Sequence, residues 1–185
     1  AGILSWGQDM DQEHNPFQCN LGYQVSLSGK GEWNKQADYV GKEALEKMAK
    51  FCAYQERCQS EVKHKLFGFG LSNEEIDNII CDLIEHSFLD EERFAKAFVR
   101  GKFNQKGWGR IKIQQHLNQK QISSFCQKKG MLEINENDYL TKLEEIILKK
   151  SNSLKTEDPF IRKSKTARYA ISRGFESELV WEILD

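Results

Sequence analysis

Proline is scarce in this chain of 185 residues, which contains only Pro16 and Pro159. Helix interiors tolerate proline least, because it lacks a backbone donor and its ring clashes with the preceding turn. Its scarcity therefore favours helices. The charged fraction of 30% and the hydrophobic fraction of 39% are typical of a soluble protein with a thin core. They argue against an α/β enzyme with a fully buried sheet.

Long hydrophobic runs are also missing. No window approaches the eighteen consecutive apolar residues of a membrane span. The start of the chain lacks the basic, apolar and small-residue order of a secretory signal. We therefore expect a cytoplasmic protein that makes no membrane contact.

Cysteine and histidine show no pattern of paired ligands. The chain has five cysteines, an odd number, with no Cys-x-x-Cys pair, and its four histidines show no ligand spacing. Scattered thiols stay reduced in the cytosol, and a structural zinc site needs ligands at short, regular spacing. We expect free thiols, no metal and no other cofactor. The cysteines are Cys19, Cys52, Cys58, Cys81 and Cys126.

Motifs for catalysis are absent as well. The sequence has no Gly-x-Ser-x-Gly elbow, no phosphate-binding glycine loop and no His-Glu-x-x-His. Glu91 and Glu92 are adjacent acids, but acids at the start of a helix ordinarily complement its macrodipole. We therefore predict that the chain is not an enzyme.

Acidic residues are missing from residues 93–132, although the formal net charge of the whole chain is −1. The preceding stretch, 56–92, is strongly acidic, and a second stretch without acids lies between Pro159 and Phe175. The charges are segregated along the chain. Local electrostatic fields should therefore be much larger than the net charge implies.

The basic residues of these stretches have two interpretations. A solvated helix face is the ordinary one. Helical surfaces usually carry both positive and negative side chains, however, because each ion pair between residues three or four positions apart stabilises a helix by about 0.2 to 0.5 kcal/mol. A stretch of forty residues without an acid lacks that stabilisation. We therefore favour a docking surface for an anionic partner. Its predicted contact residues are Arg93, Lys96, Arg100, Lys102, Lys106, Trp108, Arg110, Lys112, Lys120, Arg162, Lys165 and Arg168.

Trp108 lies between two glycines and has two interpretations of its own. It is either part of the core or an exposed anchor for the partner. We favour the core, because indole burial stabilises strongly.

Residues 1–41 differ from the rest of the chain. They are rich in glycine, contain the turn signal Asn15-Pro16, and include an alternating run at 23–28 that is typical of a strand. We expect an N-terminal extension that forms a small β-hairpin or an irregular arm. The alternative is a poorly ordered tail.

Beyond residue 41, apolar residues recur at helical spacing, as in the stripe Leu45, Met48, Ala49 and Cys52. Helix starts are also marked. The sequence predicts a capping box at Ser72 and Glu75, an N-cap at Asp90, and an N-cap with a first-turn proline at Asp158-Pro159.

The helical pattern repeats along the chain. Segments beginning at Val62, Ile113 and Lys165 each combine a short helix, a turn and a following apolar helix. Units that recur at roughly fifty residues bury their faces mainly against their neighbours. We predict an all-α fold of tandem three-helix units at 42–89, 90–136 and 137–185, in an elongated, curved array.

Three segments carry a family resemblance. They are Gln55-Glu56-Arg57-Cys58, the run from Phe88 to Val99, and Gly107-Trp108-Gly109-Arg110 with Ile111, Ile113 and Leu117 after it. With them, the chain from about residue 43 to its end resembles the RecX family. The resemblance implies three tandem three-helix units that bind the RecA filament on DNA. It also implies inhibition of strand exchange and ATP hydrolysis by RecA, without chemistry by the inhibitor.

Two functions therefore remain open. In the first, a monomer lies along the RecA filament, and its basic side meets acidic protein surface and DNA phosphates, with single- or double-stranded DNA as a direct partner. In the second, a helix-turn-helix regulator inserts its middle unit into the groove of duplex DNA. Sequence preference on naked duplex would favour the second, because base contacts specify whereas phosphate contacts do not.

Overall fold

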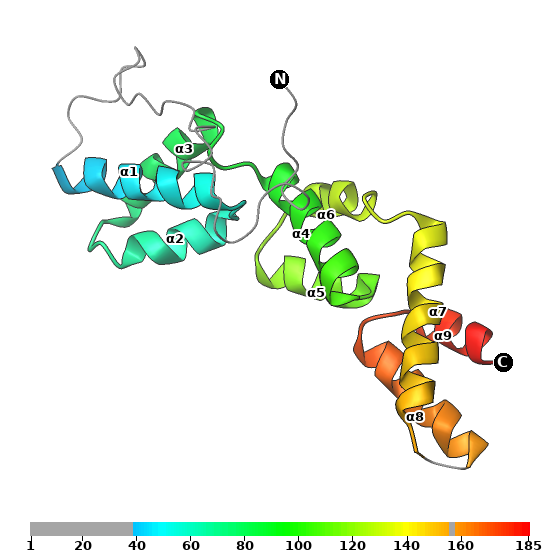
Figure 1. Ribbon diagram of the computed structural model, residues 1–185. Helices are drawn as coiled ribbons and strands as arrows, with labels where there is room; N and C mark the ends of the chain where they lie inside the picture. Colours follow the sequence, from blue (N-terminus) through cyan, green and yellow to red (C-terminus); the bar gives the residue numbers. More distant parts are fainter. Residues whose placement is uncertain (1–38, 156–157) are drawn as a thin grey trace. The chain divides into compact units, whose positions relative to one another are not determined.

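The computed structural model describes residues 39–155 and 158–185 (Figure 1). Over these residues it contains nine α-helices and no strand, so the all-α prediction is confirmed for this part of the chain. The predicted N-terminal hairpin or arm lies outside the described residues. The chain divides between Leu89 and Asp90 into two compact units. Within the described ranges, no helix is long and apolar enough to cross a membrane.

The first unit contains α1 (Tyr39–Tyr54), α2 (Gln59–Phe67) and α3 (Asn73–Glu85). Its core is formed by one apolar face of each helix, and it includes the whole predicted stripe of α1, in which Met48 is 1% exposed. The buried residues of this core are Ala44, Leu45, Met48, Ala49, Cys52, Val62, Leu66, Ile76, Ile79, Ile80, Leu83 and Leu89.

The second unit contains two groups of three helices. We call α4 (Glu91–Lys106), α5 (Arg110–Gln119) and α6 (Ser124–Met131) the second domain, and α7 (Glu136–Ser153), α8 (Pro159–Ser172) and α9 (Ser177–Leu184) the third domain. In the second domain, α6 packs closely on α4, because Gly130 faces Ala95. A Cβ atom on Gly130 would lie 3.0 Å from the Ala95 carbonyl.

The helix starts predicted from the sequence are confirmed. The Ser72 hydroxyl accepts from the backbone N–H of Glu75 at 3.3 Å, and the Glu75 carboxylate accepts from the Ser72 N–H at 2.7 Å. Asp90 accepts from the Arg93 N–H at 2.8 Å, and Asp158 caps α8 in the same way. Each cap satisfies amides that the helix itself leaves unpaired.

The repeat is most regular at the turn between the second and third helix of each group. One residue of each turn has a positive φ angle, and two positions later comes the N-cap of the third helix. Two of the three turns use glycine, which adopts this conformation without steric cost. The positive-φ residues are Gly70, Gln121 and Gly174, and the N-caps are Ser72, Ser123 and Glu176.

The second and third domains meet at two turns. The N–H of Gly109 donates to the carbonyl of Arg173 at 2.9 Å, and the N–H of Ile111 donates to the carbonyl of Gly174 at 3.0 Å. A Cβ atom on Gly109 would lie 2.2 Å from the Gly174 carbonyl oxygen. The two backbones therefore touch directly, and there is no space for a side chain between them.

We predict that Gly109→Ala destabilises the chain by at least about 2 kcal/mol, because the new methyl group must separate two hydrogen-bonded backbones. The matched control is Gly101→Ala, inside α4, where a Cβ atom would meet nothing within 4 Å. That substitution should stabilise the helix by about 0.5–1 kcal/mol. Urea unfolding of both variants measures the difference. Equal stabilities would show that the turns do not meet as described.

Candidate partner-binding surface

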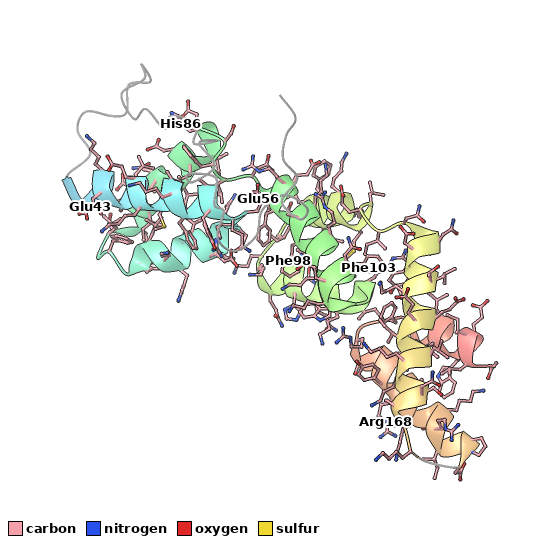
Figure 2. The ribbon with its side chains drawn as sticks, viewed as in Figure 1. Glu43, Glu56, His86, Phe98, Phe103 and Arg168 are labelled. Atoms are coloured by element: carbon pink, nitrogen blue, oxygen red, sulfur yellow. The ribbon has the colours of Figure 1, made fainter. Side chains whose placement is uncertain are left out.

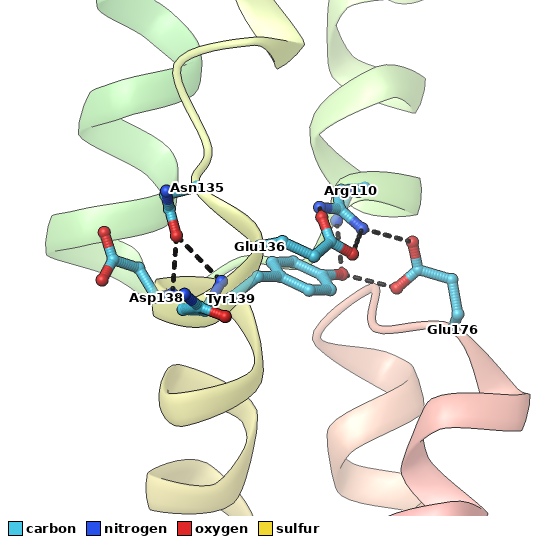
Figure 3. Close-up of polar contacts among 7 residues, drawn as sticks. Arg110, Asn135, Glu136, Asp138, Tyr139 and Glu176 are labelled. Atoms are coloured by element: carbon cyan, nitrogen blue, oxygen red, sulfur yellow. Dashed lines mark hydrogen bonds and ion pairs between the residues drawn. The ribbon is translucent and has the colours of Figure 1, made fainter.

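Arg110, one of the predicted contact residues, is engaged inside the second unit. It is the first residue of α5, and its guanidinium forms an ion pair with the Glu136 carboxylate from the start of α7. A second carboxylate, on Glu176, lies 4.0 Å away. The guanidinium carbon also lies 4.0 Å from the centre of the Tyr139 ring (Figure 3). Arg110 thus joins the two domains, and the ion pair lowers the pKa of Glu136.

Tyr139 lies beneath this ion pair and is fully buried. Its hydroxyl donates to Glu176 Oε2 at 2.5 Å and accepts from the backbone N–H of Arg110 at 3.1 Å (Figure 3). Its ring packs against Phe103 and Phe175, with centroids 5.8 and 5.1 Å away. Burial, followed by the hydrogen bond to Glu176, raises the pKa of Tyr139. The hydroxyl therefore stays a donor at all physiological pH values.

We predict that Tyr139→Phe destabilises the chain by about 1–3 kcal/mol, because the half-buried carboxylate of Glu176 loses its donor and the N–H of Arg110 loses its acceptor. The folded-state pKa is raised, so this contribution is present below about pH 10, the ordinary tyrosine value, and is lost as the pH rises above it. Unfolding free energies of the wild type and the variant should therefore converge in alkali.

Tyr169→Phe is the control for this prediction, since Tyr169 is 37% exposed. It should change the unfolding free energy by less than about 0.5 kcal/mol. A Tyr139→Phe variant as stable as this control would contradict the assignment.

Two other predicted residues, Lys96 and Arg100, also face carboxylates. Lys96 Nζ lies 2.6 Å from Glu92 Oε1, one helical turn back on α4. Arg100 Nε lies 3.8 Å from Glu133 Oε2, just beyond α6. Exposed pairs of this kind contribute little stability, but they neutralise the charge that a partner would meet.

A different environment surrounds Trp108, which is half-buried between α4 and α5. Its indole stacks on the His116 ring with centroids 4.6 Å apart. Two ammonium groups lie over the indole, Lys102 Nζ at 5.2 Å and Lys112 Nζ at 4.9 Å from its centre. Neither of the two sequence interpretations of Trp108 describes this arrangement, because the ring is partly covered by cations.

Lys120 extends the same group of cations. Its Nζ lies 5.9 Å from the ring centre of Phe98, the residue labelled on α4 in Figure 2. Burial lowers the pKa of His116, and the charges of Lys112, Lys102 and Lys120 lower it further. We call the group formed by Lys102, Trp108, Lys112, His116 and Lys120 the Trp108 cluster.

His116 is the member of this cluster that was absent from the predicted contact residues. The sequence does carry a signal for it, because Trp108, Lys112, His116 and Lys120 follow one another at intervals of four. That spacing places Lys112 and His116 on one face of α5, and Trp108 and Lys120 lie just before and just after this helix.

The remaining predicted residues lie at several places in the second unit. Arg93 is exposed in the first turn of α4, and Lys106 is exposed at its last residue. On α8, Arg162 is half-buried, whereas Lys165 and Arg168 are exposed; Arg168 is labelled in Figure 2. Across the described ranges, no three side chains of His, Cys, Asp or Glu come together as a group that could hold a metal ion.

The matches to family models follow the helix groups of the second unit. Residues 90–130 match the model described as RecX, second three-helix domain, and residues 136–184 match the model described as RecX, third three-helix domain. The chain belongs to the RecX family. The two RecX domains correspond to α4–α6 and α7–α9.

Curated relatives support the RecX assignment along most of the chain. The regulatory protein RecX of Prosthecochloris aestuarii is 27% identical over 149 residues, which cover 80% of this chain and 96% of that protein. The regulatory protein RecX of Vibrio vulnificus is 29% identical over 122 residues, which cover 66% of this chain and 78% of that protein. The chain is therefore related to regulatory proteins.

Solved RecX structures have the same fold. The crystal structure of RecX from Lactobacillus salivarius has a TM-score of 0.71 at 19% identity, covering 78% of this chain and 94% of that one. A second crystal structure of a regulatory protein RecX has a TM-score of 0.72 at 22% identity, covering 78% of this chain and 72% of that one. The RecX fold is thus shared at low sequence identity.

Proposed function

We propose that this chain is a non-enzymatic regulator that binds the RecA filament on DNA and inhibits strand exchange and ATP hydrolysis by RecA. The proposal is supported by membership of a family of regulatory proteins. Within the chain, the observation that carries it is the Trp108 cluster, which gathers positive charge on one face of the second domain.

Electrostatics favour an anionic partner for this face. Among the described residues, Lys102, Lys106 and Lys112 form no ion pair with a carboxylate. Like charges held close together repel one another, so an approaching anion gains from all of them at once. A filament of protein on DNA presents such anions at regular intervals, as phosphates along the strand.

The alternative, a helix-turn-helix regulator of duplex DNA, would place α6 in the major groove. The N-terminus of α6 is already engaged by an acid. The Glu91 carboxylate accepts from the N–H of Ser123 at 3.1 Å and from its hydroxyl at 2.9 Å. A carboxylate at that end repels DNA phosphates, which argues against this docking mode.

We predict that a variant with Lys102, Lys106 and Lys112 all changed to Glu loses at least tenfold in its inhibition of RecA ATP hydrolysis on single-stranded DNA, on the order of 1.4 kcal/mol of binding. Arg110 is left unchanged, because its ion pair joins two domains. A titration of the variant into a RecA ATPase assay measures the loss.

A charge-matched control changes three exposed lysines that belong to neither acid-free stretch, Lys42, Lys50 and Lys149. The control should inhibit like the wild type, and circular dichroism should show equal helicity for both variants. Full inhibition by the Lys102, Lys106 and Lys112 variant would show that this face does not contact the filament. Binding to naked duplex with a sequence preference would instead support the helix-turn-helix alternative.

A further inference from the structure

Cations also lie over an aromatic ring in the third domain. Lys150 Nζ, from α7, is 5.0 Å from the ring centre of Tyr169 on α8, and the Arg173 guanidinium is 6.0 Å from the same centre. Lys165, Tyr169 and Arg173 follow at intervals of four, so they share one face of α8. This arrangement resembles that of Trp108 with Lys102 and Lys112.

The two groups adjoin each other at the contact between the domains. Lys112 Nζ lies 3.5 Å from the carbonyl oxygen of Ser172, near the end of α8. In the opposite direction, Arg173 Nε donates to the carbonyl of Gly107 at 3.2 Å. Lys112 also lies over Trp108, and Arg173 also lies over Tyr169, so both groups reach the contact between the domains. The backbone contact between Gly109 and Gly174 fixes their separation.

The side chains of this surface are held in place before any partner arrives. Packing an ammonium or a guanidinium against an aromatic ring restricts a long side chain and contributes about 0.5–1 kcal/mol at exposed sites. Among the described residues, Lys102, Lys112, Lys150 and Arg173 form no ion pair with a carboxylate. The surface thus offers fixed, uncompensated positive charge beside two partly exposed rings.

We propose that a single strand of nucleic acid binds directly along this surface, with its phosphates on the cations of both domains and its bases against Trp108 and Tyr169. We call the surface the junction track and define it by Lys102, Trp108, Lys112, Lys150, Tyr169 and Arg173. The inference deepens the proposed function and rests on it for the source of the strand, which is the DNA of the filament.

A single strand fits this track better than a duplex or an acidic protein. Surfaces that bind single strands combine a basic path for the backbone with aromatic rings on which bases stack. In a duplex the base faces are covered by their neighbours, so the rings would gain nothing. An acidic protein would use the cations but would leave the two rings without a matching group.

The experiment measures binding of the whole chain to a short, fluorescently labelled oligothymidylate without RecA, over a range of salt concentrations. Each phosphate contact on a single strand contributes about 0.7 to the slope of log affinity against log salt. Changing Lys112 and Lys150 to Glu should therefore reduce the slope by about 1.4, since two contacts are lost. The charge-matched control changes Lys128 and Lys149, both exposed and outside the track, and should leave the slope unchanged.

The aromatic part of the track has its own readout. Tyr169→Leu keeps every charge but removes a ring, and it should weaken oligothymidylate binding at least about fivefold, because base stacking contributes about 1–3 kcal/mol per base. The variant should leave the salt slope unaltered. Tyr169 is exposed, so the substitution should not disturb folding, which circular dichroism checks.

The track is overturned if the wild type does not bind the oligothymidylate, if the Lys112 and Lys150 variant keeps the wild-type slope, or if a duplex binds as tightly as the single strand. These outcomes are separate from the fate of the proposed function. If the chain inhibits RecA but does not bind free oligothymidylate, the junction track is refuted and the proposed function stands. If the chain binds oligothymidylate as expected but has no effect on RecA, the proposed function is refuted and the junction track stands.

Discussion

The contact between two glycine-containing turns is the constraint on which the second unit depends. Gly109 and Gly174 bring the backbones of the second and third domains within hydrogen-bonding distance, and neither position has space for a side chain. Two helical domains joined through side chains alone would slide relative to each other, because apolar packing has little directionality. Backbone hydrogen bonds fix both the distance and the register. The cations of α5 and α8 consequently hold one arrangement.

Side chains also stabilise this contact, from the buried interior of the unit out to its surface. Tyr139 is fully enclosed and holds Glu176 through its hydroxyl, while Arg110 lies over the ring and reaches Glu136 at the surface. The same acid-free stretch thus serves two purposes. Arg110 stabilises the joint between domains through an ion pair, whereas Lys102 and Lys112 form no ion pair with a carboxylate among the described residues. A partner that engages both sides of the joint would find it already assembled, which lowers the entropic cost of binding.

Local features of this fold were predictable from the sequence, and contacts between distant segments were not. The capping box at Ser72 and the cap at Asp90 depend on residues three apart, so the sequence displays them directly. The carboxylates that engage Arg110 come 26 and 66 residues later, and no spacing rule connects them to it. Gly130 is a poor helix former. The reason for a glycine there, its approach to Ala95, exists only after α6 has packed on α4.

The cap of α6 illustrates a consequence for how the second domain folds. Ser123 is the N-cap of α6, but the acid that completes the cap, Glu91, belongs to the first turn of α4. An eight-residue helix has too few internal hydrogen bonds to persist alone. α6 therefore gains its stability when the two ends of the domain meet, and closing that loop orders the segment between them. The second domain should therefore fold and unfold in a single cooperative step.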